Sequence, residues 1–155
     1  MTTALNRYAT QGNHFVSQLA LEMDMPENNT HALRVLKAIF HGIRSRITPA
    51  SSMHLIHQLP MAVKAIYVDG WDIDRPHIQA FDFDDFITEV YRVYGSNFHY
   101  AMSRKVEVES AVHAVFKVLK KNLSDGEYSE MMTYMPVGLR LHLVDYLMEG
   151  QSYFH

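Results

Sequence analysis

The feature that most constrains this fold is an internal repeat, in which residues 34–64 align without a gap to residues 110–140. In both stretches apolar residues recur three and four positions apart, the spacing that gives a helix one apolar face. A repeat of this kind indicates that one structural unit occurs twice. We therefore expect two copies of a helical unit, with Phe40 and Phe116 at equivalent core positions. The identical pairs are Ala38 with Ala114, Phe40 with Phe116, and Pro60 with Pro136.

Both copies predict a second, shorter helix that begins at a capping residue. Thr48 stands directly before a proline in the first copy, and Ser124 with Glu127 forms a capping box in the second. A side-chain oxygen at such a position accepts hydrogen bonds from backbone N–H groups of the first turn. Pro60 and Pro136 then end these helices and begin the next ones, because proline lacks the N–H donor that a helix interior needs.

Upstream of the repeat, the apolar positions of residues 15–19 match those of 86–90, so the second copy is longer in its early loop. We predict an all-α fold of about eight helices, arranged as two tandem four-helix repeats that pack into one pseudo-twofold bundle. We expect a single domain over 1–155, because neither half alone would bury a comfortable core. Its parts are repeat 1 at about 13–69, a turn-rich connector at 70–82, and repeat 2 at about 83–148. The predicted helices lie near 13–24, 30–46, 49–58, 61–69, 84–94, 106–122, 125–134 and 137–148.

Charge and composition exclude several classes of partner. The chain carries a net charge of -3, so it offers no broad positive field for nucleic acid or anionic lipid. No run approaches the ~18 apolar residues that cross a bilayer, and the first residues lack the apolar segment of a secretion signal. The absence of Cys excludes disulfides, thiol catalysis and thiolate metal sites. We expect a cytoplasmic protein that binds neither nucleic acid nor membrane.

Ten histidines make a metal site the first chemistry to consider, because imidazole is the commonest metal ligand. His54 and His57 are the best pair, since a spacing of three places both on one face of a helix. No third ligand stands near them in the sequence, although the fold can bring a carboxylate or His31 beside them. His142 and Asp145 have the same spacing, and a local hydrogen bond explains them. We expect no tight metal site and no cofactor.

Catalytic and nucleotide-binding motifs are absent from the sequence. The seven glycines form no phosphate-binding series, and neither a GxSxG elbow nor an HExxH helix is present. The acidic group Asp82, Asp84 and Asp85 opens a predicted helix, where carboxylates stabilise exposed backbone N–H groups. We assign no catalytic residue, although the members of a Ser/His/Asp triad need not be adjacent. A binding module is therefore favoured over an enzyme.

Three short sequences are more specific than the helical pattern alone. They are Leu59-Pro60, the run Tyr67-Val-Asp-Gly-Trp71-Asp, and Phe83-Asp-Asp-Phe86 at the start of the second copy. Together they resemble the bacterial family known as domain of unknown function 2267, over roughly residues 13–148. The resemblance implies a duplicated helical domain, and it implies no activity, catalytic residue or cofactor. The second copy departs from the pattern at Met135, which precedes its proline, and in its longer early loop.

The leading functional hypothesis is a non-catalytic helical module for protein interaction or regulation. It follows from the missing chemical motifs and from a surplus of residues favoured at interfaces, with nine Tyr, eight Phe and ten Met. The stretch Tyr94–Met102 is the candidate surface for a protein partner or for homo-oligomerisation.

The alternative is a small enzyme or ligand-binding protein with a cleft between the two repeats. Tyr67, Trp71 and His77 are its candidate lining residues, because they flank or belong to the connector that joins the copies. Trp71 is also the largest apolar anchor there, so we expect it to pack against the first copy. A concave, partly polar cavity at this place favours the alternative, and a filled core favours the interaction module.

Overall fold

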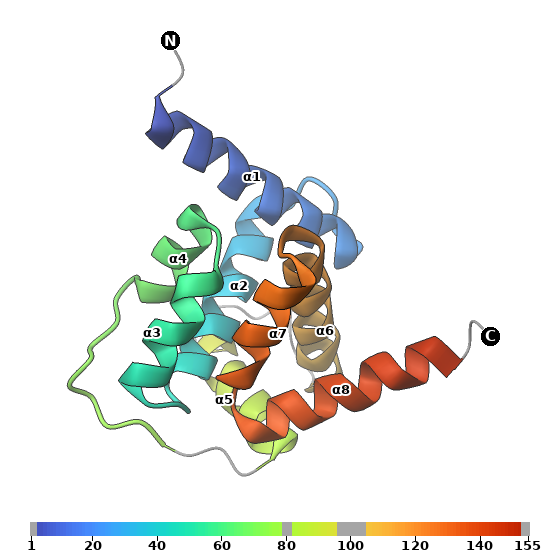
Figure 1. Ribbon diagram of the computed structural model, residues 1–155. Helices are drawn as coiled ribbons and strands as arrows, with labels where there is room; N and C mark the ends of the chain where they lie inside the picture. The colour runs from blue at the N-terminus through green and yellow to red at the C-terminus, as the bar shows by residue number, and fades with distance from the viewer. Residues whose placement is uncertain (1–2, 79–81, 96–104, 153–155) are drawn as a thin grey trace.

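The computed structural model describes residues 3–78, 82–95 and 105–152, and every regular element in these ranges is an α-helix (Figure 1). The predicted all-α fold is confirmed. None of the helices in these ranges has the length and apolar character needed to span a membrane. The eight helices of the described chain are α1 (Ala4–Glu22), α2 (Asn29–Arg44), α3 (Pro49–Gln58), α4 (Met61–Val68), α5 (Phe83–Gly95), α6 (Lys105–Asn122), α7 (Asp125–Thr133) and α8 (Val137–Ser152).

Helix α1 begins at Ala4, whereas the apolar pattern predicted a start near residue 13. The Thr3 hydroxyl caps the helix by accepting a hydrogen bond from the backbone N–H of Asn6 at 3.1 Å. The first buried residue of the helix is Gly12, so the preceding turns are largely exposed. These first turns carry no apolar stripe, so the apolar pattern could not reveal them and the predicted start lay too far along the chain.

The predicted caps of the two short helices are present. At the start of α7, the Ser124 hydroxyl accepts from the Glu127 backbone N–H at 3.1 Å. The Glu127 carboxylate in turn accepts from the Ser124 backbone N–H at 2.9 Å. At the start of α3, the Thr48 hydroxyl accepts from the Ser51 backbone N–H at 3.1 Å. These bonds satisfy donors that lack a partner inside the helix.

The helices enclose one cluster of buried apolar side chains, to which both halves of the chain contribute. Phe40 and Phe116 are both buried in it, as predicted. Across the halves, α2 packs against α5, α1 against α6, and α3 against α7. A twofold relation between halves requires reciprocal pairs of this kind. The two-repeat symmetry itself stays a prediction.

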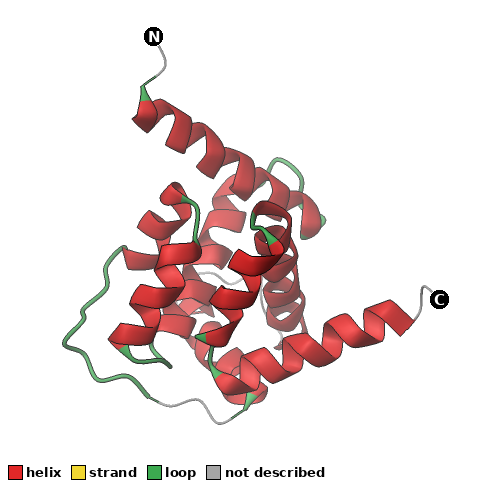
Figure 2. Cartoon of the chain, viewed as in Figure 1, coloured by secondary structure: helices red, strands yellow, loops and turns green. Residues whose placement is uncertain are grey.

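The connector leaves the end of α4 and follows the outside of the molecule toward α5 as an extended loop (Figure 2). Trp71 lies at the start of this loop and is partly buried. Its ring and the Tyr67 ring meet edge to face, with their centroids 6.2 Å apart. Trp71 therefore packs against the first half, as predicted. Further along, the Ile78 N–H donates to the Ser45 carbonyl at 2.8 Å. The first contact holds the start of the loop against α4, and the second holds its later part beside the end of α2.

Candidate functional site

A groove of about 560 Å³ lies where the connector passes α2 and α5. Trp71 and His77, two of the three residues expected at a cleft, line it together. Tyr67 does not line it, because this side chain is fully buried and its hydroxyl shares a hydrogen bond with that of Ser52 at 2.7 Å. Tyr67 instead packs against Trp71, which lines the groove.

One wall of the groove contains an ion-paired cluster that joins the two halves. The Glu89 carboxylate on α5 accepts hydrogen bonds from Arg92 at 2.6 Å and from Arg46, which follows α2, at 3.2 Å. The bond from Arg92 is the main reason that the pKa of Glu89 lies below its ordinary value, and Arg46 lowers this pKa further. Glu89 is a buried carboxylate, so these two guanidinium groups balance the cost of removing its charge from water.

Another part of the lining lies where α2 meets the end of α4. The Arg44 guanidinium donates to the backbone carbonyls of Tyr67 at 2.7 Å and Asp69 at 2.8 Å, which the last turn of α4 leaves without helical partners. Beside it, burial lowers the pKa of His41 to about 4, so this ring is neutral at pH 7. Arg75 stands exposed on the connector. The groove thus combines several guanidinium groups with one indole ring.

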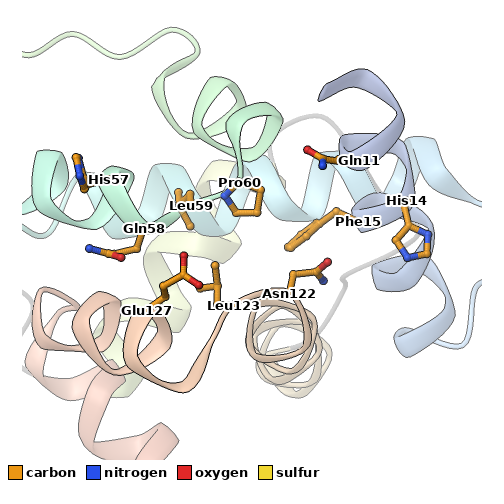
Figure 3. A pocket seen from close by; sticks show the side chains of 10 residues that line it. All are labelled: Gln11, His14, Phe15, His57, Gln58, Leu59, Pro60, Asn122, Leu123 and Glu127. Carbon is orange, nitrogen blue, oxygen red and sulfur yellow. The ribbon is translucent and has the colours of Figure 1, made fainter. Parts of the chain in front are cut away.

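A second hollow of about 330 Å³ lies where α1 meets the α3–α4 and α6–α7 turns (Figure 3). His57 and His14 stand at opposite ends of it and do not face each other (Figure 3). His54 is exposed on the same helix as His57 and stacks on Tyr134, with ring centroids 4.6 Å apart. His31 is buried on α2. Within the described residues, no third metal ligand therefore joins His54 and His57.

The structure instead gathers three side chains of types that ligate metals, Glu109 and His113 on α6 with His142 on α8. Their ligand atoms all lie within 4.8 Å of one another. The Nε2 atoms of His113 and His142 are 2.8 Å apart and share a hydrogen bond, and Glu109 Oε1 lies 3.6 Å from His142 Nε2. The sequence paired His142 with Asp145 and missed this cluster, because its partners lie about 30 residues away on another helix.

One aromatic ring stacks on each ring of the histidine pair, His113 and His142. Phe83 stacks on His142 with ring centroids 3.6 Å apart, and Tyr146 stacks on His113 at 3.8 Å. Burial is the main cause that lowers the pKa of His113 to about 4, and the neighbouring His142 lowers it further. His113 is therefore neutral at pH 7, with a nitrogen lone pair available to a proton or to a metal.

The family model of uncharacterized conserved proteins, DUF2267, matches residues 12–141 of the chain. The chain belongs to this family. The resemblance inferred from Leu59-Pro60 and from the Tyr67–Trp71 run is thereby confirmed, since both lie inside the matched range. No curated protein matches the chain significantly. The matched range contains the connector groove and α6, and it ends directly before His142.

Helix α8 of this DUF2267 member carries apolar side chains on more than one face. Leu139 and Leu143 are buried against the core. Val137, Leu141 and Val144 point away from it and are 53%, 57% and 50% exposed. Figure 1 shows α8 extending from the helical body toward the C-terminus. We call these three exposed side chains the outer face of α8.

The surface predicted at Tyr94–Met102 falls mostly outside the described residues. Tyr94 itself is buried, and its hydroxyl shares a hydrogen bond with His31 Nδ1 at 2.8 Å. This ring is therefore part of the packing between α2 and α5 and not of a free surface. Residues 96–102 lie outside the described ranges.

Proposed function

We propose that the chain is a non-catalytic helical module that works through protein contacts, and that the outer face of α8 is its binding surface. The observation that carries this proposal is the exposure of Val137, Leu141 and Val144 on a helix whose other side is already buried. A row of exposed apolar residues on a helix, apart from its buried face, is typical of an interaction site.

The spacing and the flanking charges indicate a second copy of this chain as the partner. Val137, Leu141 and Val144 follow one another at intervals of four and three, which are the d, a and d positions of a heptad. Arg140 then occupies a g position and Asp145 the following e position. In a parallel pair of helices, g of one chain faces the next e of the other. Two Arg140–Asp145 ion pairs would therefore flank the apolar row of a parallel α8 dimer.

Sedimentation velocity over about 10 to 500 µM protein tests this surface. We expect a weak dimer, because three exposed side chains bury far less than the ~800 Å² per partner of a standard interface. Leu141→Glu should abolish the dimer by placing a charge in the apolar row. Leu5→Glu is the matched control, since Leu5 is an exposed apolar residue on α1. A wild-type chain that stays monomeric over this range overturns the proposal.

A charge exchange tests the parallel arrangement separately. Arg140→Asp or Asp145→Arg alone should weaken the dimer, because each places like charges opposite one another. The double variant Arg140→Asp with Asp145→Arg should restore it. Failure of the double variant to recover, with both single variants still folded by circular dichroism, rules out the parallel α8 pair.

The groove at the connector favours a second candidate function, the binding of a small carboxylate or phosphate compound. Its volume of about 560 Å³ lies within the range of small-molecule sites, and Arg44, Arg75 and Arg92 line it beside the Trp71 ring. Guanidinium groups match the geometry of carboxylate and phosphate oxygens, and an indole ring offers a stacking face. A concave, partly polar cavity beside the connector supports this ligand-binding alternative.

Trp71 is the single tryptophan of the chain, so its fluorescence reports on this groove directly. Citrate and inorganic phosphate serve as the probes. A saturable emission change is expected, and Arg75→Gln should weaken binding by about tenfold, whereas Arg7→Gln on α1 should not. No emission change, or an equal response in both variants, removes this candidate and leaves the α8 proposal untouched.

A further inference from the structure

The three side chains between α6 and α8 have the chemistry of a transition-metal site. Glu109 and His113 are one helical turn apart on α6, a spacing that points both toward the same neighbour. His142 reaches them from α8, and the three ligand atoms lie within 4.8 Å of one another. We propose that Glu109, His113 and His142 bind one divalent cation of the zinc and nickel class.

Two imidazoles and one carboxylate form a ligand set that suits zinc, with a fourth position left to water. All three side chains are partly exposed, so an ion can reach them from solvent. Lys117, one turn beyond His113 on α6, is a nearby positive charge that opposes binding. The Glu109 carboxylate supplies the compensating negative charge within the ligand set.

The histidine pair already has its nitrogens nearly in place. The two rings are almost coplanar, at 6°, and their centroids are 5.1 Å apart, so the Nε2 atoms point at each other across 2.8 Å. A tetrahedral ion about 2.0 to 2.1 Å from each nitrogen needs them roughly 3.3 Å apart. The rings therefore have to separate by roughly half an ångström and tilt toward Glu109.

This adjustment is a change of tautomer and needs no other reactant. At present one Nε2–H donates to the lone pair of the other Nε2. On binding, that proton moves to Nδ1 of the same ring, and both Nε2 lone pairs face the ion. Phe83 and Tyr146 stack on the ring faces and not on the edges, so they allow the rings to slide within their planes.

The site differs from the one that the sequence pointed to. His54 and His57 are exposed on α3, and no third ligand joins them among the described residues. The expectation of no tight metal site rested on sequence spacing, which does not show that α8 brings His142 to α6. His54 and His57 therefore serve as the internal control for the proposed site.

Isothermal titration of the full chain with zinc chloride, and separately with nickel chloride, at pH 7 tests the proposal. We expect one ion per chain with a dissociation constant at or below about 1 µM. His142→Gln should weaken binding by more than about 100-fold, since even groups outside the ligand set contribute 10- to 100-fold. His57→Gln should leave the affinity unchanged.

Glu109→Gln keeps the proposal testable if His142→Gln loosens α8. It leaves the histidine pair intact and removes one charged ligand, so affinity should fall while the melting temperature without metal stays the same. Cobalt(II) provides a second readout, because a tetrahedral site gives visible absorption that these variants should lose together. No binding by the wild type, or binding that survives in His142→Gln and disappears in His57→Gln, overturns the proposal.

Discussion

The last helix of each half meets its neighbours differently. In the first half, α4 packs along both α1 and α2, whereas α8 packs along α5 and meets α6 through the histidine pair. When the repeat offset is extended, Glu109 and His142 take the places of Leu33 and Ile66, two apolar residues packed against the core. These two positions are thus apolar in the first half and polar in the second, while His113 takes the place of Lys37. The proposed metal site thus lies where the second half departs from the first.

In each half the first helix crosses the last helix at a glycine, but the glycine lies on a different helix in each half. A Cβ on Gly12 of α1 would lie 2.6 Å from the Ala62 Cβ of α4. A Cβ on Gly138 of α8 would lie 2.5 Å from the carbonyl carbon of Asp82, directly before α5. At each crossing, one of the two segments therefore needs a residue without a Cβ. In the first half this residue is Gly12 on the first helix, and in the second half it is Gly138 on the last helix.

The largest expected effect comes from the two equivalent core rings. Phe40→Ala and Phe116→Ala should each lower the free energy of unfolding by about 3 to 5 kcal/mol, because both rings are buried and leave a cavity. Urea denaturation followed by circular dichroism measures both values. Similar losses strengthen the comparison between halves. A large loss at only one position would show that the halves do not share a core register.

A smaller loss is expected from the crossing of α5 and α8. Gly138→Ala should cost about 1 to 3 kcal/mol, since the added methyl group meets backbone atoms that have little room to move. Gly126→Ala is the control, because a Cβ there has no atom within 4 Å and lies in a helix that favours Ala. Thermal unfolding of both variants measures the difference. Equal melting temperatures would mean that this crossing is not tightly packed.

The helices of the fold were largely predictable because their signals are local. The capping box at Ser124 and Glu127 and the proline junctions depend on residues within one turn of each other, and a sequence displays such spacings directly. The start of α1 was missed because its first turns are exposed and carry no apolar pattern. Burial of Phe40 and Phe116 followed from the same local periodicity.

The candidate sites were less predictable because they depend on contacts between helices. Trp71 and His77 were expected at a cleft because the connector holds both, and they line the same groove. The contact between His113 and His142 depends on how α8 packs, which no spacing along the chain specifies. The outer face of α8 was missed for a related reason, since its apolar residues look like core until the neighbouring helices are placed.

The smallest expected effect is an acid sensitivity in the first half. Burial is the main cause that lowers the pKa of His41 to about 4, Arg44 and Lys37 lower it further, and Asp69 opposes them. The unfolded chain takes up this proton near pH 6.5, so stability should fall as the pH drops from about 6.5 to 4 and stay level above that.

Because His41 is partly exposed, the free energy of unfolding should fall by only about 1 to 2 kcal/mol over this pH range. Urea unfolding at a series of pH values measures it. His41→Gln should reduce the slope without removing it, because burial lowers the pKa of His113 to about 4 as well. His54→Gln is the control because that ring is exposed. An unchanged slope in His41→Gln would show that this ring is protonated in the folded chain.

Hydrogen–deuterium exchange of α4 and α8 at two protein concentrations tests the central claim most directly. The two halves share one helical plan, and α4 exposes Met61 and Val68 at the places of Val137 and Val144, but it has Ala65 where α8 has Leu141. We assign the face for a second copy to α8. The amides of α8 should therefore exchange more slowly at about 500 µM than at about 5 µM, whereas those of α4 should not change. Exchange of α8 that does not depend on concentration, or slowing confined to α4, would contradict this account.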